Sequence, residues 1–385
     1  EAWVAYQWAV HLSERFDVTV LTYRKRGAPP IAPQLPKARV IEFLEPPLVG
    51  RAERLNSLLK PGYFVFYARA RAWLRQARRG EVFDIGHQVV PVAMRYPSPL
   101  IGSGIPFVMG PVGGSLDSPQ GFVSSETGPW YLKLRALDRW RLRNDPPLRR
   151  TYESADCVLA IADYVTESLR GLTVRRLEVM SETGLVELPD ADDRPVRPTA
   201  TADDPVRLIF VGRVIRTKGA RDLVAAMGLL KGQPVVADIV GDGYDLPDCK
   251  KLAQELGVTD TVTFHGQQGR AAVHEAYRKA DIFVFPSYRE PGGNVVFEAM
   301  GHGLPLIVCD RGGPSAAVDD ACAISLRADD PTQLAADLAA AIKDLIADPE
   351  RRQAMGQAAR ARLAEVGLWP AKIDRMAALY DSIRH

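Results

Sequence analysis

The sequence has few cysteines, little net charge and no long apolar run. Its 385 residues include four cysteines, which lack the spacing of a metal or redox site. We therefore expect buried, reduced thiols in a cytoplasmic protein. The net charge of +2 argues against a dedicated nucleic-acid-binding protein. No apolar run approaches the roughly 18 residues that a transmembrane helix needs.

A doubly wound α/β domain begins with a strand and a glycine-rich turn, and neither is present at the start of this chain. Residues 1–16 already have the apolar spacing of an amphipathic helix, and a strand-like segment follows at 17–22. We therefore expect a chain that is truncated at its N-terminus. No G-x-G-x-x-G motif follows a strand with an acidic residue about 20 positions later, which disfavours a nicotinamide-dependent dehydrogenase.

Strand-like and helical segments alternate through the rest of the chain, as a parallel α/β fold requires. The expected strands are 17–22, 38–43, 83–87, 106–110, 157–162, 207–212, 235–241, 261–266, 281–285, 305–309 and 322–326. Residues 189–205 are rich in Pro, Asp and Thr and are expected to form a linker. We predict one domain over 1–188, a second over 206–366, and a last helix over 367–385. Two such domains would face each other across a cleft.

The segment 286–305 contains the most informative pattern in the sequence. A strand leads into a loop that contains Glu290, and the helix that follows contains Glu298. The amides of Gly293, Asn294 and Val295 at the start of this helix are expected to face an anion, because a helix N-terminus has unpaired N–H groups and partial positive charge. A phosphate site flanked by two carboxylates suits a sugar nucleotide.

A second pattern lies at 208–219, where a strand, a glycine turn and a helix start follow one another. Arg213 and Lys218 lie in this turn. Two cations at such a position can stabilise the charge that develops on a departing diphosphate without a metal.

Together these two patterns resemble the retaining glycosyltransferases of family 4, which have the GT-B fold. The resemblance extends through 239–246, 262–267 and 312–318, although Ala316 stands where the family often has Glu. It implies that Arg213 and Lys218 hold the donor diphosphate, that Glu298 holds the ribose, and that Glu290 orients the sugar. It implies a UDP-, GDP- or ADP-sugar donor, no cofactor and no metal. The acceptor would be a saccharide or a lipid-linked saccharide in cell-surface polysaccharide or glycolipid biosynthesis.

The first half of the chain offers three further candidate residues. Gly113 and Gly114 lie in a glycine loop that resembles one in bacterial members that build polysaccharides, and a plain tight turn is the alternative. His87 ends an expected strand where the family often has a histidine near the transferred sugar. The usual second histidine is replaced by Val89, so a structural histidine is the alternative.

Two segments, 51–79 and 129–150, combine basic and aromatic residues. Such segments suit an anionic membrane surface, which predicts peripheral contact with the inner face of a membrane. The alternative is two solvated helices whose aromatic residues join the core. The sequence Asp-Ala-Asp at 190–192 resembles a metal motif of other glycosyltransferases, but it lies in the expected linker and we assign it no metal.

Two other functions fit the same residues. A sugar-nucleotide epimerase of similar fold would act on the donor alone, and a non-catalytic nucleotide-sugar-binding protein would bind the donor without transfer.

Overall fold

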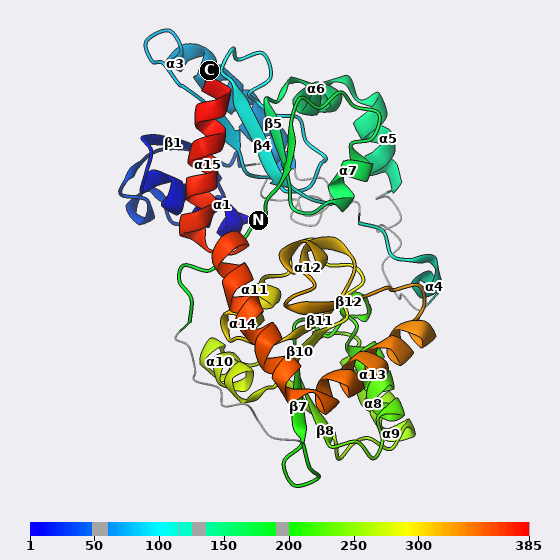
Figure 1. The fold of residues 1–385 in the computed structure, drawn as a ribbon. Coiled ribbons are helices and arrows are strands. Elements are labelled where there is room, and N and C mark those ends of the chain that lie inside the picture. Colours follow the sequence, from blue (N-terminus) through cyan, green and yellow to red (C-terminus); the bar gives the residue numbers. More distant parts are fainter. Residues whose placement is uncertain (48–60, 115, 125–135, 190–199, 385) are drawn as a thin grey trace.

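The structure, a computed structural model, describes residues 1–47, 61–114, 116–124, 136–189 and 200–384. These residues form two lobes stacked one above the other (Figure 1). Each lobe contains parallel β-sheet with helices packed around it, so the α/β fold class expected from the sequence is confirmed.

The C-terminal lobe is built on a six-stranded parallel sheet with the order β12-β11-β10-β7-β8-β9. This order places β7 and β10 at the centre, where the order of the strands switches from one side of β7 to the other. All six expected strands are present. The elements are β7 Val206–Val211, η3 Arg216–Lys218, α8 Ala220–Leu229, β8 Val235–Val240, α9 Leu246–Glu255, β9 Val262–Gly266, α10 Arg270–Lys279, β10 Ile282–Phe285, α11 Asn294–Gly301, β11 Leu306–Cys309, α12 Gly312–Ala317, β12 Ala323–Leu326, α13 Pro331–Ala347 and α14 Pro349–Val366.

The N-terminal lobe contains two separate parallel sheets, β1-β2 and β3-β4-β5-β6, where the sequence predicted one doubly wound sheet. The short strand β6 was not predicted, because three residues are too few to show a periodic pattern. The elements are α1 Ala2–Ser13, β1 Val18–Arg24, η1 Ala32–Gln34, β2 Ala38–Leu44, α3 Pro61–Ala77, β3 Gly86–Gln88, β4 Phe107–Val112, α4 Gln120–Val123, α5 Ala136–Asn144, α6 Pro146–Ser154, β5 Cys157–Ala160, α7 Tyr164–Ser168 and β6 Leu177–Val179.

The last helix, α15 (Trp369–Arg384), leaves the C-terminal lobe and packs along the N-terminal lobe (Figure 1). Trp369 at its start meets Trp8 of α1 edge-to-face, with ring centroids 5.2 Å apart. Beside this crossing, Leu185 and Leu368 form a β-bridge, so the two chain segments that join the lobes are paired. Most of the expected linker, 190–199, lies outside the described residues.

A third segment, residues 116–123, reaches from the N-terminal lobe onto the C-terminal lobe. Its Phe122 is fully buried in the core of the C-terminal lobe. The ring stacks near Tyr288, with centroids 4.0 Å apart, and the guanidinium of Arg216 lies over it at 5.2 Å. Within the described residues, the lobes are therefore connected at three places.

Candidate nucleotide-sugar site

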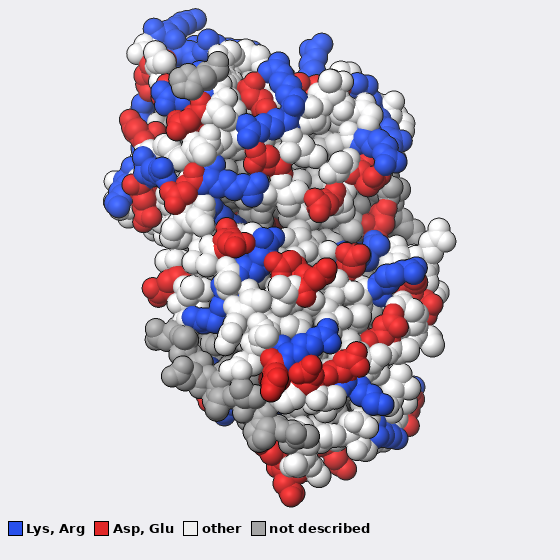
Figure 2. Space-filling model, in the orientation of Figure 1, with Lys and Arg blue, Asp and Glu red and all other residues white. Residues whose placement is uncertain are grey.

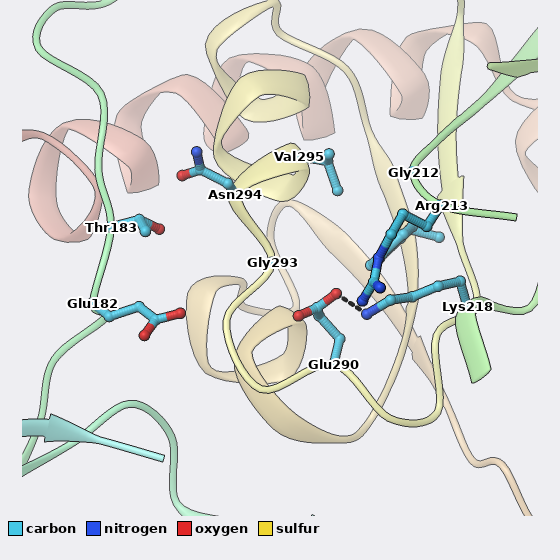
Figure 3. A pocket seen from close by; sticks show the side chains of 10 residues that line it. Glu182, Thr183, Gly212, Arg213, Lys218, Glu290, Gly293, Asn294 and Val295 are labelled. Carbon is cyan, nitrogen blue, oxygen red and sulfur yellow. Dashed lines mark hydrogen bonds and ion pairs between the residues drawn. The ribbon is translucent and has the colours of Figure 1, made fainter. Parts of the chain in front are cut away.

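An open pocket of about 290 Å³ lies between the lobes, at the carboxyl ends of β7 and β10 (Figure 3). Parallel α/β sheets bind ligands at this edge, where the strand order reverses. The lining residues are Glu182, Thr183, Gly212, Arg213, Lys218, Phe285, Glu290, Gly293, Asn294 and Val295. The structure thus brings together six of the residues that the sequence singled out, from two patterns about seventy residues apart: Arg213, Lys218, Glu290, Gly293, Asn294 and Val295.

The N-terminus of α11 forms one wall of the pocket. Gly293 precedes the helix with a φ of 100°, a conformation that a side chain disfavours. The amide of Gly292 donates to Glu290 Oε1 at 3.3 Å. Among the described residues, no hydrogen bond is formed by the amides of 293–295. These three amides are therefore available to an anion.

The glycines at 312–313 support this wall from behind. Gly313 donates its amide to the carbonyl of Glu290 at 2.9 Å. A Cβ at Gly313 would lie 1.8 Å from the carbonyl oxygen of Gly292. The GGPSAAV segment therefore shapes the turn that carries Glu290, which explains its glycines without a catalytic role.

Two cations line the opposite side of the pocket. Lys218 ends the short helix η3, and the chain turns sharply at Gly219, where a Cβ would lie 2.2 Å from the carbonyl oxygen of Pro286. The Lys218 ammonium is buried and forms an ion pair with Glu290. Burial lowers the pKa of Lys218, and Glu290 partly offsets this. Arg213 has no ion-pair partner within the described ranges, so its guanidinium is available to a ligand.

Glu298 lies one turn beyond Asn294 on α11 and does not line this pocket. Its Oε2 accepts from the Tyr277 hydroxyl at 3.3 Å, and burial raises its pKa. The half-buried carboxylate can accept further hydrogen bonds, because the bond from Tyr277 occupies only one of its two oxygens.

His87 does not reach the pocket, which argues against the catalytic role expected for it. Its Nε2 lies 2.6 Å from the carbonyl oxygen of Gly110, and its Nδ1 lies 2.5 Å from the Tyr380 hydroxyl. The neutral ring satisfies both contacts by donating from Nε2 and accepting at Nδ1. Both nitrogens are therefore engaged in holding β3, β4 and α15 together, as the structural alternative predicted.

Gly113 and Gly114 also lie outside the pocket lining. A Cβ at Gly113 would lie 2.1 Å from Ile161 Cδ1, so a side chain at this position would force Ile161 to move. The amide of Gly114 donates to the Tyr164 hydroxyl at 3.1 Å. The pKa of Tyr164 is raised to about 12 by burial and, in smaller part, by the charges of Glu182 and Glu290. The glycine loop thus lies near the pocket and is fixed by packing.

Two pocket residues, Glu182 and Thr183, were missed by sequence reasoning. They follow β6 in the loop that leads out of the N-terminal lobe. The only signal was their place after a strand, and that strand is too short to be recognised from the sequence.

The predicted membrane-facing segments are described only from 61 and from 136 onward. In α3, Tyr63 is buried and stacks on Tyr96 with centroids 4.7 Å apart, and Trp73 packs on Phe83 at 5.9 Å. Phe64 of α3 and Trp140 of α5 are instead 53% and 62% exposed, so the aromatic residues of these segments are divided between the interior and the surface. Basic and acidic side chains are interspersed over the face seen in Figure 2.

No helix in the described part of the chain has the length and apolar character needed to cross a membrane. Within the same residues, no group of three or more His, Cys, Asp or Glu is placed to hold a metal ion.

Comparison with known sequences adds independent information on the C-terminal half. Residues 193–362 match the model of the family described as glycosyl transferases group 1. D-inositol 3-phosphate glycosyltransferase of Segniliparus rotundus is 34% identical over 178 residues, which cover 44% of this chain and 38% of the relative. The enzyme of that name from Kribbella flavida is 30% identical over 236 residues, covering 56% of this chain and 55% of the relative. The matched region thus spans 38% of the length of the first relative and 55% of the length of the second.

Solved structures resemble the whole chain in fold. Sucrose-phosphate synthase of Thermosynechococcus elongatus has a TM-score of 0.63 at 20% identity, covering 100% of this chain and 93% of that one. HepE of Anabaena, solved in complex with UDP, has a TM-score of 0.60 at 15% identity, covering 95% and 100%. The chain therefore has the GT-B fold, and its residues 193–362 match the family model of glycosyl transferases group 1.

Proposed function

We propose that this protein is a metal-independent, retaining glycosyltransferase that uses a nucleotide diphosphate sugar. The observation that carries the proposal is the convergence of two cations, three unpaired amides and a carboxylate on one pocket. A diphosphate matches the cations and amides, and sugar hydroxyls match the carboxylate. The family match over 193–362 and the UDP bound to the similarly folded HepE support this assignment.

In the proposed complex, Arg213, Lys218 and the amides of 293–295 hold the diphosphate, and Glu298 accepts from the ribose hydroxyls. Glu290 orients the sugar. The bond from the anomeric carbon to the phosphate oxygen breaks, and the acceptor oxygen bonds to the same face of that carbon. The leaving phosphate oxygen takes the acceptor's proton. Positioning and stabilisation of the phosphate charge supply most of the rate.

The proposed setting is cell-surface polysaccharide or glycolipid biosynthesis at the inner face of a membrane, with a saccharide or a lipid-linked saccharide as acceptor. The relatives named D-inositol 3-phosphate glycosyltransferase match only 44% and 56% of this chain, so they support the reaction type more than the acceptor.

The first experiment is a thermal-shift panel of UDP-, GDP- and ADP-sugars, because a ligand that binds only the folded state raises the melting temperature. Turnover is then measured with the donor that binds. We expect Lys218→Ala and Glu298→Ala to lower turnover by about 100-fold or more, as removal of charge-stabilising groups does in other enzymes. Lys250→Ala, at an exposed position of α9, is the control.

Product analysis separates the rivals. Nucleoside diphosphate released from the donor alone, together with an altered free sugar, would indicate an epimerase. Tight donor binding without any transfer would indicate a binding protein. Near-normal turnover in both Ala variants would overturn the site assignment.

A further inference from the structure

Glu182 is a carboxylate in the pocket for which neither the sequence patterns nor the proposed roles account. It lies on the loop between β6 and the segment that leaves the N-terminal lobe, and its side chain points into the pocket toward the turn that carries Glu290 (Figure 3). Its carboxylate has no hydrogen-bond or ion-pair partner within the described parts of the chain.

The backbone around Glu182 is fixed by two buried side chains. Trp8 Nε1 donates to the carbonyl of Glu182 at 2.9 Å. Lys372 Nζ donates to the carbonyl of Ser181 at 2.9 Å and also to the carbonyl of Thr183. Three successive carbonyls are therefore held, while the side chain between them stays unpaired.

The Lys372 ammonium belongs to α15, the helix that crosses between the lobes, and only 3% of this residue is exposed. A buried ammonium needs acceptors, and the loop at 181–183 supplies them. The loop that presents Glu182 is thus part of the rigid connection between the lobes. A ligand-binding group must be held at a fixed position, and a rigid loop provides this.

The opposite wall leaves room for the Glu182 carboxylate. A Cβ at Gly292 would lie 2.7 Å from Glu182 Oε1, so any larger residue there would displace the carboxylate. Glu182 therefore lies against the backbone of the turn that also carries Glu290. Burial raises the pKa of Glu182, the N-terminal ammonium opposes this rise, and the charge of Glu290 adds to it, while Lys372 has a smaller lowering effect.

We propose that Glu182 binds hydroxyl groups of the transferred sugar, which is then held between Glu182 of the N-terminal lobe and Glu290 of the C-terminal lobe. This inference rests on the proposed function. The cations and the three amides lie in the C-terminal lobe and suit the diphosphate, so a hydroxyl-bearing group is the part of the donor that two facing carboxylates suit. An unpaired, half-buried carboxylate also lowers the stability of the free protein, which is the pattern expected of a ligand-binding group.

The test compares a nucleoside diphosphate with its sugar derivative by calorimetric titration. The probes are UDP with UDP-glucose, GDP with GDP-mannose and ADP with ADP-glucose, and the pair that binds the wild type is used. For Glu182→Ala we expect affinity for the nucleotide sugar to fall about 10-fold or more, as loss of hydrogen bonds to a charged group predicts. Affinity for the nucleoside diphosphate should be unchanged.

Three further variants sharpen the result. Glu182→Gln keeps the shape and removes the charge, and Gly292→Ala displaces the carboxylate without removing it. Both should weaken sugar binding selectively. Glu187→Gln, at an exposed position of the same segment, should bind both probes like the wild type. The melting temperature of Glu182→Ala should equal or exceed that of the wild type, which separates a binding role from a structural one.

An equal loss of affinity for both probes would overturn the inference, as would no loss for either. An unchanged nucleotide-sugar affinity with a raised KM for the acceptor would assign Glu182 to the acceptor and also overturn it. If the wild type binds none of the probes, the proposed function itself fails, and this inference fails with it.

Discussion

At the scale of single residues, the ion pair between Lys218 and Glu290 connects the two halves of the proposed donor site. Lys218 is buried, and its ammonium contacts Glu290 in the pocket that is proposed to hold the diphosphate. A diphosphate must therefore share Lys218 with a carboxylate that repels it. The pair keeps the buried ammonium neutralised before a ligand arrives.

This competition predicts an unusual effect of Glu290→Gln. Removal of the negative charge should strengthen binding of a nucleoside diphosphate about 3- to 10-fold, since a charge at this distance in a partly solvated site contributes on the order of 1 kcal/mol. Turnover with the nucleotide sugar should nevertheless fall. Calorimetric titration and an activity assay measure the two effects, with Asp260→Asn at an exposed position as control. Weaker binding of the diphosphate would mean that Glu290 does not oppose it.

His87 predicts a pH dependence of stability. Burial lowers its pKa from 6.5 to about 4, and the contact with Gly110 offsets this only in part. Between these pH values the unfolded chain binds more protons, so stability is complete above pH 6.5 and is lost as the pH falls toward 4. The slope contributed by one histidine is at most about 1.4 kcal/mol per pH unit.

The measurement is urea unfolding of the wild type and of His87→Gln between pH 4 and 7. His11 and His274 also have lowered pKa values, so only the difference between the two proteins reports on His87. That difference should shrink as the pH falls. A constant difference across the range would show that His87 does not titrate in this window.

The sequence predicted which residues meet in this pocket where those residues lie in local motifs. Arg213 and Lys218 follow one strand, Glu290 follows another, and the carboxyl ends of neighbouring parallel strands must meet. His87 and Glu182 could not be resolved, because their surroundings come from α15 and α1, far away in the chain. The contacts of these two residues therefore depend on how distant segments pack.

At the scale of elements, the C-terminal lobe was the predictable part. Its central strands β7, β10 and β11 are short, largely buried runs between turn residues, and all six strands pair in parallel. The N-terminal lobe was less predictable, because β3 and β6 have three residues each and β1-β2 forms a sheet of its own. A helical or strand pattern needs more residues than these to be recognised.

The glycine loop after β4 gives a prediction at this scale. In Gly113→Ala the new methyl would lie 2.1 Å from Ile161 Cδ1, so β4 and β5 must shift apart or Ile161 must change rotamer. We expect a loss of about 1–3 kcal/mol in the free energy of unfolding, as is usual for overpacking. Chemical denaturation measures this loss.

The control is Gly80→Ala, because a Cβ there would have no atom within 4 Å. This variant should change stability by less than about 0.5 kcal/mol, as surface substitutions usually do. If both variants have the same stability, the loop is not constrained by packing. The ligand-binding role predicted for Gly113 would then be favoured.

At the scale of the whole molecule, the position of one lobe relative to the other is set by three connections. Two of them are the paired segments at Leu185 and Leu368, beside the Lys372 contacts. The third is the segment 116–123, which inserts Phe122 into the core of the C-terminal lobe. This segment begins just beyond the glycine loop, so it ties that loop to the lobe that contains the proposed diphosphate site.

Removal of the third connection should affect catalysis more than binding of a nucleoside diphosphate. Phe122→Ala deletes a fully buried ring that contacts Tyr288 and Arg216, so we expect a loss of about 3–5 kcal/mol in unfolding free energy. In the folded fraction at low temperature, the proposed diphosphate groups remain together in the C-terminal lobe. Phe122 contacts Arg216 and Tyr288, which lie two residues from Lys218 and Glu290, so affinity for a nucleoside diphosphate should fall, but by less than turnover.

In the proposed function, turnover depends on groups from both lobes, because Glu182 and Thr183 line the same pocket as the C-terminal groups. We therefore expect turnover of Phe122→Ala to fall about 10-fold or more, since small misplacements of reacting groups lower rates strongly. Val123→Ala is the matched control, because Val123 is the next residue after Phe122 and is 59% exposed. Equal losses of nucleotide affinity and turnover would mean that Phe122 supports only the C-terminal lobe, whereas a selective loss of turnover shows that this segment sets the relative position of the two walls.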